Sequence, residues 1–337
     1  MTSSPRRMAL WLGGVAALAL AFPAGAFAAH DLKIYKAEKQ VDLTSDDTSW
    51  DVSCKPGDFA IDGMWRLDHS DLDPDADSLL DLSSAVDVWE AYPSDTDTYH
   101  FRFNKNAIGR VQMKIWVTCL GKKTDDGIHT LVVSDSGSAT ASLAVPNALF
   151  DSNTVAVGAP PAVLNDGASC PAGYVIASPG YQLTGDDGSG GILSARLASS
   201  FPFSSTPPAA PSALQAWRWQ FVGVAPGAQV KLYSRCLKVK YNFGTPSDPH
   251  KHKLTVKFRP TGGYATDSIP DGTTKEVRRD CNASGKAMIG AFYAPFDEIW
   301  FWGMDPRIKQ RAFKFSNTGG APLNVRTGIL CLEYQTT

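Results

Sequence analysis

The chain has 337 residues, of which 43% are hydrophobic and 10% aromatic, and its formal net charge is −2. This composition excludes a disordered or collagen-like chain, and the near-neutral charge excludes a protein that binds nucleic acid through bulk charge alone. The length is sufficient for two or three domains of ordinary size. Six cysteines are too few for a disulfide-dense miniature scaffold, but their number is even, so their positions matter.

The first predicted element is an export signal. Arg6 and Arg7 precede an apolar run from Met8 to Phe22, which is followed by Ala26-Phe27-Ala28. A basic start, about 15 apolar residues and a small-x-small site are typical of a secretory signal peptide, whereas a membrane span needs about 20 apolar residues. We therefore expect residues 1–28 to be cleaved. The mature protein would then be secreted from a bacterium or held at its surface, where disulfides persist.

The cysteines fall into three pairs whose surroundings recur. The intervals within the pairs are 65, 66 and 50 residues. Two glycines follow the first cysteine of every pair, and the more distant one is called the second glycine below. Leucine directly follows the other cysteine of the pair, and an alternating aromatic segment precedes that cysteine by about 16 residues. The pairs are Cys54 with Cys119, Cys170 with Cys236, and Cys281 with Cys331, and the second glycines are Gly63, Gly180 and Gly290.

These recurrences predict three copies of one module after the signal peptide. Module 1 spans residues 29–122, module 2 spans 127–240 and module 3 spans 250–337. Aromatic and polar residues alternate in segments such as Tyr99–Phe103, as a strand with one buried face requires, and Gly, Pro, Asn and Asp separate these segments at turn-like spacing. The sequence therefore predicts an all-β protein of three tandem β-sandwich or jelly-roll-like modules.

The repeat also selects one cysteine pairing among fifteen. Each module would contain one disulfide, which closes a loop of 50–66 residues and stabilises the module by about 4 kcal/mol in the loop-entropy model. The predicted disulfides are Cys54–Cys119, Cys170–Cys236 and Cys281–Cys331.

This pattern resembles the Cys-framed β repeats of secreted bacterial proteins, which carry Cys-Pro-x-Gly, a Tyr-Pro or similar step, an aromatic strand and a closing cysteine. The best matches are Cys170-Pro171-Ala172-Gly173-Tyr174 and Tyr92-Pro93. The third copy departs from the pattern, because no proline follows Cys281 and about 15 residues of its middle are missing. The resemblance implies an exported surface protein and carries over no functional residues.

An acidic stretch in module 1 is the candidate metal site. Asp71, Asp73, Asp75 and Asp77 alternate as in the opening of a calcium loop, in which several carboxylates converge on a hard cation. Two features argue against calcium: Ala76 replaces the glycine of such a loop, and Leu82 stands where the bidentate acid should be. The alternative is a solvated acidic loop, and we expect no other cofactor.

Module 3 contains the candidate binding residues. Trp300 and Trp302 would share one face of a strand, with Phe301 on the other, so one side could form a stacking platform for sugar rings. The alternative is that these aromatic residues fill the core of a short module. Nearby, Arg278 and Arg279 could contact anionic polysaccharide or lipid head groups.

Charge is distributed unevenly along the chain. Residues 42–97 carry 16 acidic and two basic side chains, whereas residues 231–286 carry 12 basic and five acidic ones. Such differences can arise by drift among the surfaces of repeats. Alternatively, the acidic end of one molecule attracts the basic end of the next, and such a head-to-tail contact propagates into a filament. The segment Asp31–Leu43 could reinforce the contact as a strand added to a neighbouring sheet.

The chain lacks a nucleophile elbow, a zinc-protease motif and a phosphate-binding loop, so we expect no enzymatic activity. The main hypothesis is an exported structural or adhesive protein of the cell surface, which assembles with itself or with other surface proteins into a filament or layer. The alternative is a soluble, lectin-like protein that binds carbohydrate or another envelope component. Nucleic acid is not an expected partner.

Overall fold

The computed structural model describes residues 31–43, 47–68, 86–105, 111–124, 130–131, 133–134, 142–144, 163–164, 170, 172–184, 196–202, 209–222, 229–245, 248–282, 285–294 and 298–336. These residues contain strands, turns and loops but no helix, so the prediction of an all-β protein is confirmed. Among them, the structure has no helix that could cross a membrane. The predicted signal peptide, residues 1–28, lies outside the described residues.

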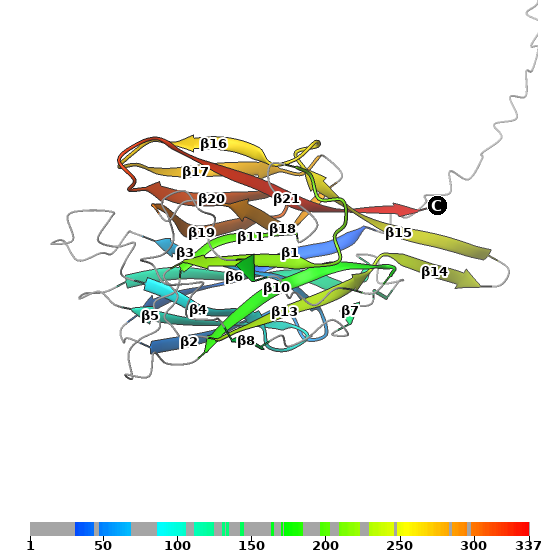
Figure 1. The fold of residues 1–337 in the computed structure, drawn as a ribbon. Helices are drawn as coiled ribbons and strands as arrows, with labels where there is room; N and C mark the ends of the chain where they lie inside the picture. Colours follow the sequence, from blue (N-terminus) through cyan, green and yellow to red (C-terminus); the bar gives the residue numbers. More distant parts are fainter. Residues whose placement is uncertain are drawn as a thin grey trace, which may run out of the picture.

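The described strands form three antiparallel sheets (Figure 1). The first sheet has the order β1 (Leu32–Leu43), β6 (Val111–Thr124), β3 (Phe59–Asp68), β19 (Ile299–Arg307), β20 (Gln310–Asn317) and β17 (Thr274–Asp280). The second has the order β2 (Asp47–Ser53), β5 (Thr98–Lys105), β4 (Val86–Pro93), β10 (Tyr174–Thr184), β13 (Gln229–Lys238) and β7 (Val133–Ser134), with β8 (Ser142–Ala144) also on β13. The third has the order β14 (Lys240–Thr245), β15 (Asp248–Arg259), β21 (Leu323–Thr336), β18 (Lys286–Tyr293), β11 (Arg196–Pro202), β12 (Trp217–Val222) and β9 (Val163–Leu164), with β16 (Ala265–Ile269) also on β21.

Each sheet combines strands of two modules. In module 1, β3 pairs with β6 on one side and with β19 of module 3 on the other. In the same way, β10 of module 2 pairs with β4 of module 1, and β18 of module 3 pairs with β11 of module 2. Every module is therefore joined to both others, and the three modules close into a ring with pseudo-threefold symmetry.

The ring has a shared interior. Strands β3, β10 and β18, which follow the first cysteine of each module, contact one another. One cluster of buried apolar side chains includes residues from all three modules. The modules thus follow one another in sequence but share sheets and core in space, and modules 1 and 3 are direct neighbours.

The three modules repeat even the irregularities of their strands. Strands β3, β10 and β18 each shift register against the closing strand of their own module, just before the repeated glycine. Strands β4, β11 and β19 each shift register against the aromatic strand that follows them. The extra residues of these second bulges are Trp89, Ala198 and Trp302.

The predicted cysteine pairs form the disulfides Cys54–Cys119, Cys170–Cys236 and Cys281–Cys331. Near each disulfide, the amide of the first cysteine donates a hydrogen bond to the loop that precedes the aromatic strand. The acceptors are the carbonyl oxygens of Asp97, Gln215 and Lys309, at 2.8, 2.7 and 2.8 Å. In every module, therefore, the disulfide joins the first cysteine to the closing strand, and the hydrogen bond joins it to the loop before the aromatic strand.

Two ion pairs join modules 1 and 3 within the chain. Lys286 Nζ lies 2.7 Å from Asp31 Oδ2, and Arg66 Nη1 lies 3.5 Å from Asp305 Oδ2. Neither pair joins the acidic segment 42–97 to the basic segment 231–286, because Asp31 and Asp305 both lie outside the acidic segment. The attraction expected between these two segments therefore stays a prediction. The predicted strand for exchange, Asp31–Leu43, is also engaged internally, because β1 pairs with β6 from Leu32 to Leu43.

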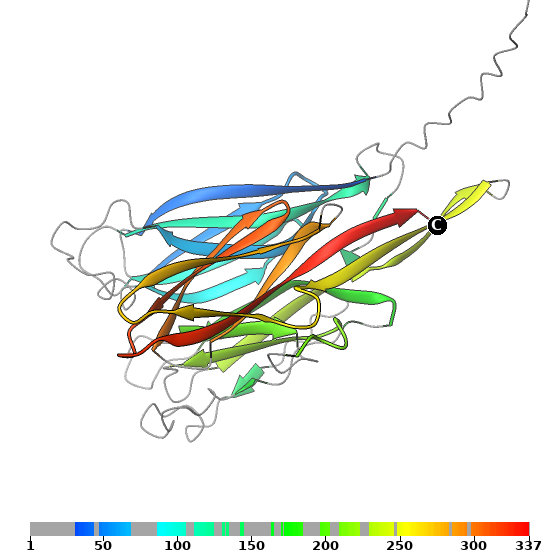
Figure 2. The same ribbon diagram turned by 90° about the horizontal axis from the view of Figure 1, so that it is seen from above.

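One hairpin extends past the rest of the sheets. Strands β14 and β15 pair from Lys240 with Lys253 to Thr245 with Asp248, and their tip projects from the end of the molecule at which the chain ends (Figure 2). Most of β14 and the first two residues of β15 fall in residues 241–249, between the predicted boundaries of modules 2 and 3.

The repeated glycines lie where other parts of the molecule leave no room for a side chain. A Cβ atom on Gly63 would overlap the ring of Tyr99, and one on Gly290 would overlap the Met304 sulfur. A Cβ atom on Gly180 would lie 2.6 Å from the Ala91 carbonyl oxygen, which belongs to another strand's backbone. The repetition of glycine therefore reflects the dense interior of the ring.

We predict that alanine at these glycines lowers stability in a defined order. Overpacking a core typically costs about 1–3 kcal/mol. Gly180→Ala should cost most because backbone cannot move aside, Gly63→Ala should be intermediate, and Gly290→Ala least because a methionine side chain can adapt. Urea unfolding of the three variants measures this order. Equal losses at all three positions would contradict the role of the neighbouring atoms.

Candidate functional site

A pocket lies at one end of the ring, where all three modules contribute. The residues that precede the second bulge of each module, Val88, Leu197 and Phe301, line it together. The empty space is about 440 Å³, which includes the part open to solvent. Its walls are mainly apolar, as are those of most small-molecule sites.

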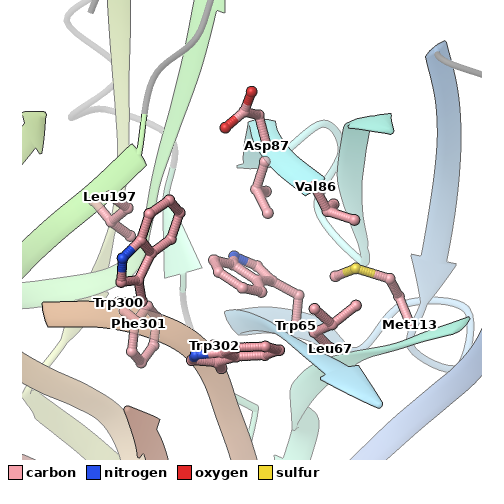
Figure 3. A pocket seen from close by; sticks show the side chains of 10 residues that line it. Trp65, Leu67, Val86, Asp87, Met113, Leu197, Trp300, Phe301 and Trp302 are labelled. Atoms are coloured by element: carbon pink, nitrogen blue, oxygen red, sulfur yellow. The ribbon is translucent and has the colours of Figure 1, made fainter. Parts of the chain in front are cut away.

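Three indole rings form much of the wall (Figure 3). Trp65 comes from β3 of module 1, and Trp300 and Trp302 come from β19 of module 3. Figure 3 shows the three rings around one space, with Trp65 and Trp300 on two sides and Trp302 below them. Trp65 and Trp300 are partly exposed, whereas Trp302 is only 2% exposed. The pairing of β3 with β19 brings these residues of modules 1 and 3 together.

A bulge interrupts the expected alternation of Trp300, Phe301 and Trp302. Trp302 is the extra residue of a bulge between Phe301 and Gly303, and a bulge locally breaks the alternation of side chains between the two faces of a sheet. All three aromatic residues therefore line the same pocket. Burial of Trp302 agrees with the alternative of a packed aromatic cluster, while Trp300 stays partly open to solvent.

Phe301 connects the pocket to the core. Its ring lies edge-on to Trp65, with 5.4 Å between centroids, and it stacks on Phe292 at 3.8 Å. Phe292 in turn lies 5.9 Å from Phe315, which is fully buried. Because aromatic packing fixes side chains in single positions, the pocket wall is held by the interior of the ring.

Asp87 supplies the charge of the pocket. It is partly buried near the start of β4 and lies on the side opposite Trp302 (Figure 3). Among the described lining residues it is the only charged one, since the others are Trp65, Leu67, Val86, Val88, Met113, Leu197, Trp300, Phe301 and Trp302. Its carboxylate oxygens point away from the three indole rings (Figure 3), so the negative charge lies at the rim of the pocket.

Arg278 and Arg279 do not belong to this pocket. They lie on β17, at the edge of the first sheet, and each pairs with an acid. Arg278 Nη2 lies 2.6 Å from Glu276 Oε1, and Arg279 forms an ion pair with Asp267. The predicted binding residues are therefore divided between the pocket and a separate, internally neutralised edge.

The predicted calcium ligands Asp71, Asp73, Asp75 and Asp77 lie outside the described residues. In the part of the chain that the structure describes, no cluster of three or more His, Cys, Asp or Glu residues could hold a metal ion.

A second cavity lies deeper, on the pseudo-threefold axis. The residues before the three repeated glycines, Asp62, Pro179 and Ile289, line it together. Two of these positions receive a polar contact from the preceding module in the ring. Tyr99 donates a hydrogen bond of 2.7 Å to the Pro179 carbonyl oxygen, and Arg311 Nη2 lies 3.5 Å from Asp62 Oδ2.

Asp62 and Arg311 form a buried ion pair between modules 1 and 3. Arg311 is fully buried and Asp62 is 3% exposed. Arg311 also donates hydrogen bonds to Thr118 Oγ1 at 3.1 Å and to the carbonyl oxygens of Ala287 and Met288 at 3.1 and 2.7 Å. One guanidinium group thus contacts two sheets and two modules, which gives it a structural role.

Burial disfavours charge on both members of the pair. It raises the pKa of the Asp62 carboxyl group to about 7, although Arg311 acts in the opposite direction. It also lowers the pKa of Arg311, against the attraction of Asp62. A carboxyl group with a pKa near neutrality can act as a general acid or base, but Asp62 is engaged with Arg311 in the interior of the ring.

Sequence reasoning identified Trp300 and Trp302 but missed Trp65, Asp87, Asp62 and Arg311. A recurring proline is the signal that could have indicated Arg311. One proline of each module pairs with a residue at the start of the aromatic strand: Pro93 with Tyr99, Pro202 with Trp217, and Pro306 with Arg311. Tyr99, Trp217 and Arg311 point inward, where each is at most 1% exposed. An arginine at a position otherwise occupied by buried aromatic residues signals a buried partner.

Comparison of the sequence with protein-family models and with curated proteins finds no match to either.

We predict that Arg311→Met strongly destabilises the protein. The substitution leaves Asp62 and two carbonyl groups without their partner, and breaking a buried ion pair costs about 3–5 kcal/mol. Urea unfolding measures the loss, and Arg278→Met on the exposed edge is the control, with an expected change below about 0.5 kcal/mol. A loss of the same small size for both variants would refute the role of Arg311.

We also predict a pH effect that depends on Asp62. Because the pKa of Asp62 in the folded protein exceeds the value of about 3.9 in an unfolded chain, the folded state binds this proton more tightly. The free energy of unfolding therefore falls as pH rises from about 4 to about 7, relative to Asp62→Asn, and the difference is constant above that range. Unfolding of both proteins between pH 4.5 and 8.5 tests this. Parallel stability curves would show that Asp62 does not titrate in this window.

Proposed function

We propose that the protein is an exported, non-catalytic binding protein of the cell envelope, which takes its ligand in the aromatic pocket at the end of the ring. The observation that carries this proposal is the exposure of Trp65 and Trp300 in a pocket that opens to solvent. Indole rings bind apolar and cationic ligand groups with little loss of conformational entropy, so they are frequent in binding sites.

Export is part of the same proposal. Three disulfides are consistent with an oxidising environment, and the sequence of residues 1–28 is typical of a signal peptide. A closed ring with a shared core and one disulfide per module suits a protein that works without chaperones outside the cell, because cross-links restrict the unfolded chain.

The relative position of modules 1 and 3 does not favour a linear head-to-tail filament. A head-to-tail filament requires the acidic and basic modules to lie at opposite ends of the molecule. Modules 1 and 3 instead share a sheet, and ion pairs such as Lys286–Asp31 connect them. The Lys286–Asp31 pair supports closure of the ring, although Asp31 lies outside the acidic segment 42–97.

A structural or adhesive subunit is the second candidate, and the edge of the first sheet favours it. β1 occupies that edge over 12 residues, and in the described part of the chain only β6 pairs with it. An open edge can accept a strand of another molecule. Lys33, Lys36 and Lys39 are exposed along β1, and lysines on an edge strand weaken such pairing. Negative-stain microscopy of native material would show assemblies if this candidate is correct.

We predict that retention on envelope preparations depends on Trp300. Trp300→Ala removes a wall of the pocket from a partly exposed position, so binding should fall at least about tenfold while folding is kept. Retention on a glycan array and on isolated envelopes measures the effect. The matched control is Trp50→Phe, because Trp50 is also partly exposed but lies on β2 beneath Lys39 Nζ, 4.2 Å from its ring centroid. Equal retention of both variants would refute the proposed site.

A further inference from the structure

We infer that the aromatic pocket binds a quaternary ammonium group, such as the trimethylammonium end of choline. This inference rests on the proposed function and names the class of ligand for that same site. It follows from three properties of the pocket: the arrangement of its indole rings, the sign of its charge, and the scarcity of its hydrogen-bonding groups.

The first property is the arrangement of the indoles. Trp65, Trp300 and Trp302 surround one space from different sides (Figure 3). The face of an indole ring is negative, and it attracts a cation within about 6 Å of the ring centre. Several indole faces around one space attract the same cation together, and tryptophan is the strongest of the aromatic residues in this role.

The second property is the charge. Asp87 is the only charged residue among the described residues that line the pocket, and no lysine, arginine or histidine is found among them. Lys314 Nζ lies 5.6 Å from the Trp302 ring centroid but does not line the pocket. The Trp302 ring therefore already contacts one cation.

The third property separates quaternary ammonium from other ligands. A primary ammonium group has three donors to satisfy, and a sugar ring has several hydroxyl groups. Burying such groups without partners costs free energy. The described lining side chains offer one carboxylate as acceptor, and the three indole N–H groups can only donate. A trimethylammonium group carries positive charge but no hydrogen-bond donor, so its methyl groups can contact Leu67, Met113 and the indoles without leaving a donor unpaired.

The experiment compares charged and uncharged ligands of the same shape. The exported protein is titrated with choline, with tetramethylammonium and with 3,3-dimethylbutanol, in which carbon replaces the nitrogen of choline. Tryptophan fluorescence and calorimetry report binding. We expect choline and tetramethylammonium to bind, and the uncharged analogue to bind at least about tenfold more weakly because it lacks the cation–π and carboxylate attraction.

Two substitutions test the residues. Trp300→Ala should abolish choline binding, and Asp87→Asn should weaken it about three- to tenfold while leaving the affinity for 3,3-dimethylbutanol unchanged. The controls are Trp50→Phe and Asp51→Asn, which change an indole and an exposed carboxylate outside the pocket. Near-UV circular dichroism shows whether each variant is folded, and Trp300→Phe provides a milder change if Trp300→Ala is not.

Two further samples identify the source of the ligand group. Binding to phosphatidylcholine vesicles, but not to phosphatidylglycerol vesicles, would indicate a head group at a surface. Binding of free choline alone would indicate a small solute. Both results support the inference.

Other outcomes overturn it. If 3,3-dimethylbutanol binds as tightly as choline, the site is merely apolar and the inference fails, although the pocket remains a binding site. If choline does not bind but retention on glycans or envelopes still depends on Trp300, the ligand class is wrong and the proposed function stands. If neither choline binding nor Trp300-dependent retention is found, both proposals fail.

Discussion

The fold depends on the pairing between the central strand of each module and a strand of its neighbour. A sheet edge is a row of unsatisfied backbone groups. Each module has two such edges: β3 and β4 in module 1, β10 and β11 in module 2, and β18 and β19 in module 3. The pairs β3–β19, β10–β4 and β18–β11 join these edges within the chain, over one or two residue pairs each. Closure then places the three central strands against one another. The shared core, the repeated glycines and both cavities follow from that contact.

Much of the local structure could be predicted, because the signals are local. The cysteine pairs, the second glycines and the alternating aromatic segments each depend on residues close in sequence, and they led to the β modules and the disulfide pairing. Closure of the ring could not be predicted, because it is made by backbone hydrogen bonds between distant strands. Such pairs leave little trace in side-chain chemistry; Arg66 opposite Gly303, for example, has no recognisable pattern.

The candidate site was predicted in part for the same reason. Trp300 and Trp302 could be identified because they lie close together in a segment rich in aromatic residues. Trp65 and Asp87 belong to module 1 and reach the pocket only through closure of the ring. The bulge at Trp302 changed the expected facing of the side chains, since period-two reasoning assumes an uninterrupted ladder. Sequence patterns thus located one wall of the pocket, and topology supplied the others.

The ion pair between Asp62 and Arg311 has a consequence for how a triplicated chain selects its own arrangement. Three similar modules with similar edges could join in the wrong order, or exchange a module with a second molecule. The residues that open the aromatic strands differ, however: Tyr99 reaches a carbonyl group, whereas Arg311 reaches a carboxylate. Only module 3 carries the cation that Asp62 requires, so any other neighbour would leave a buried acid unpaired. The sequence therefore specifies which modules become neighbours. The single difference between the repeats at Arg311 makes the closed monomer lower in free energy than arrangements that leave Asp62 without Arg311.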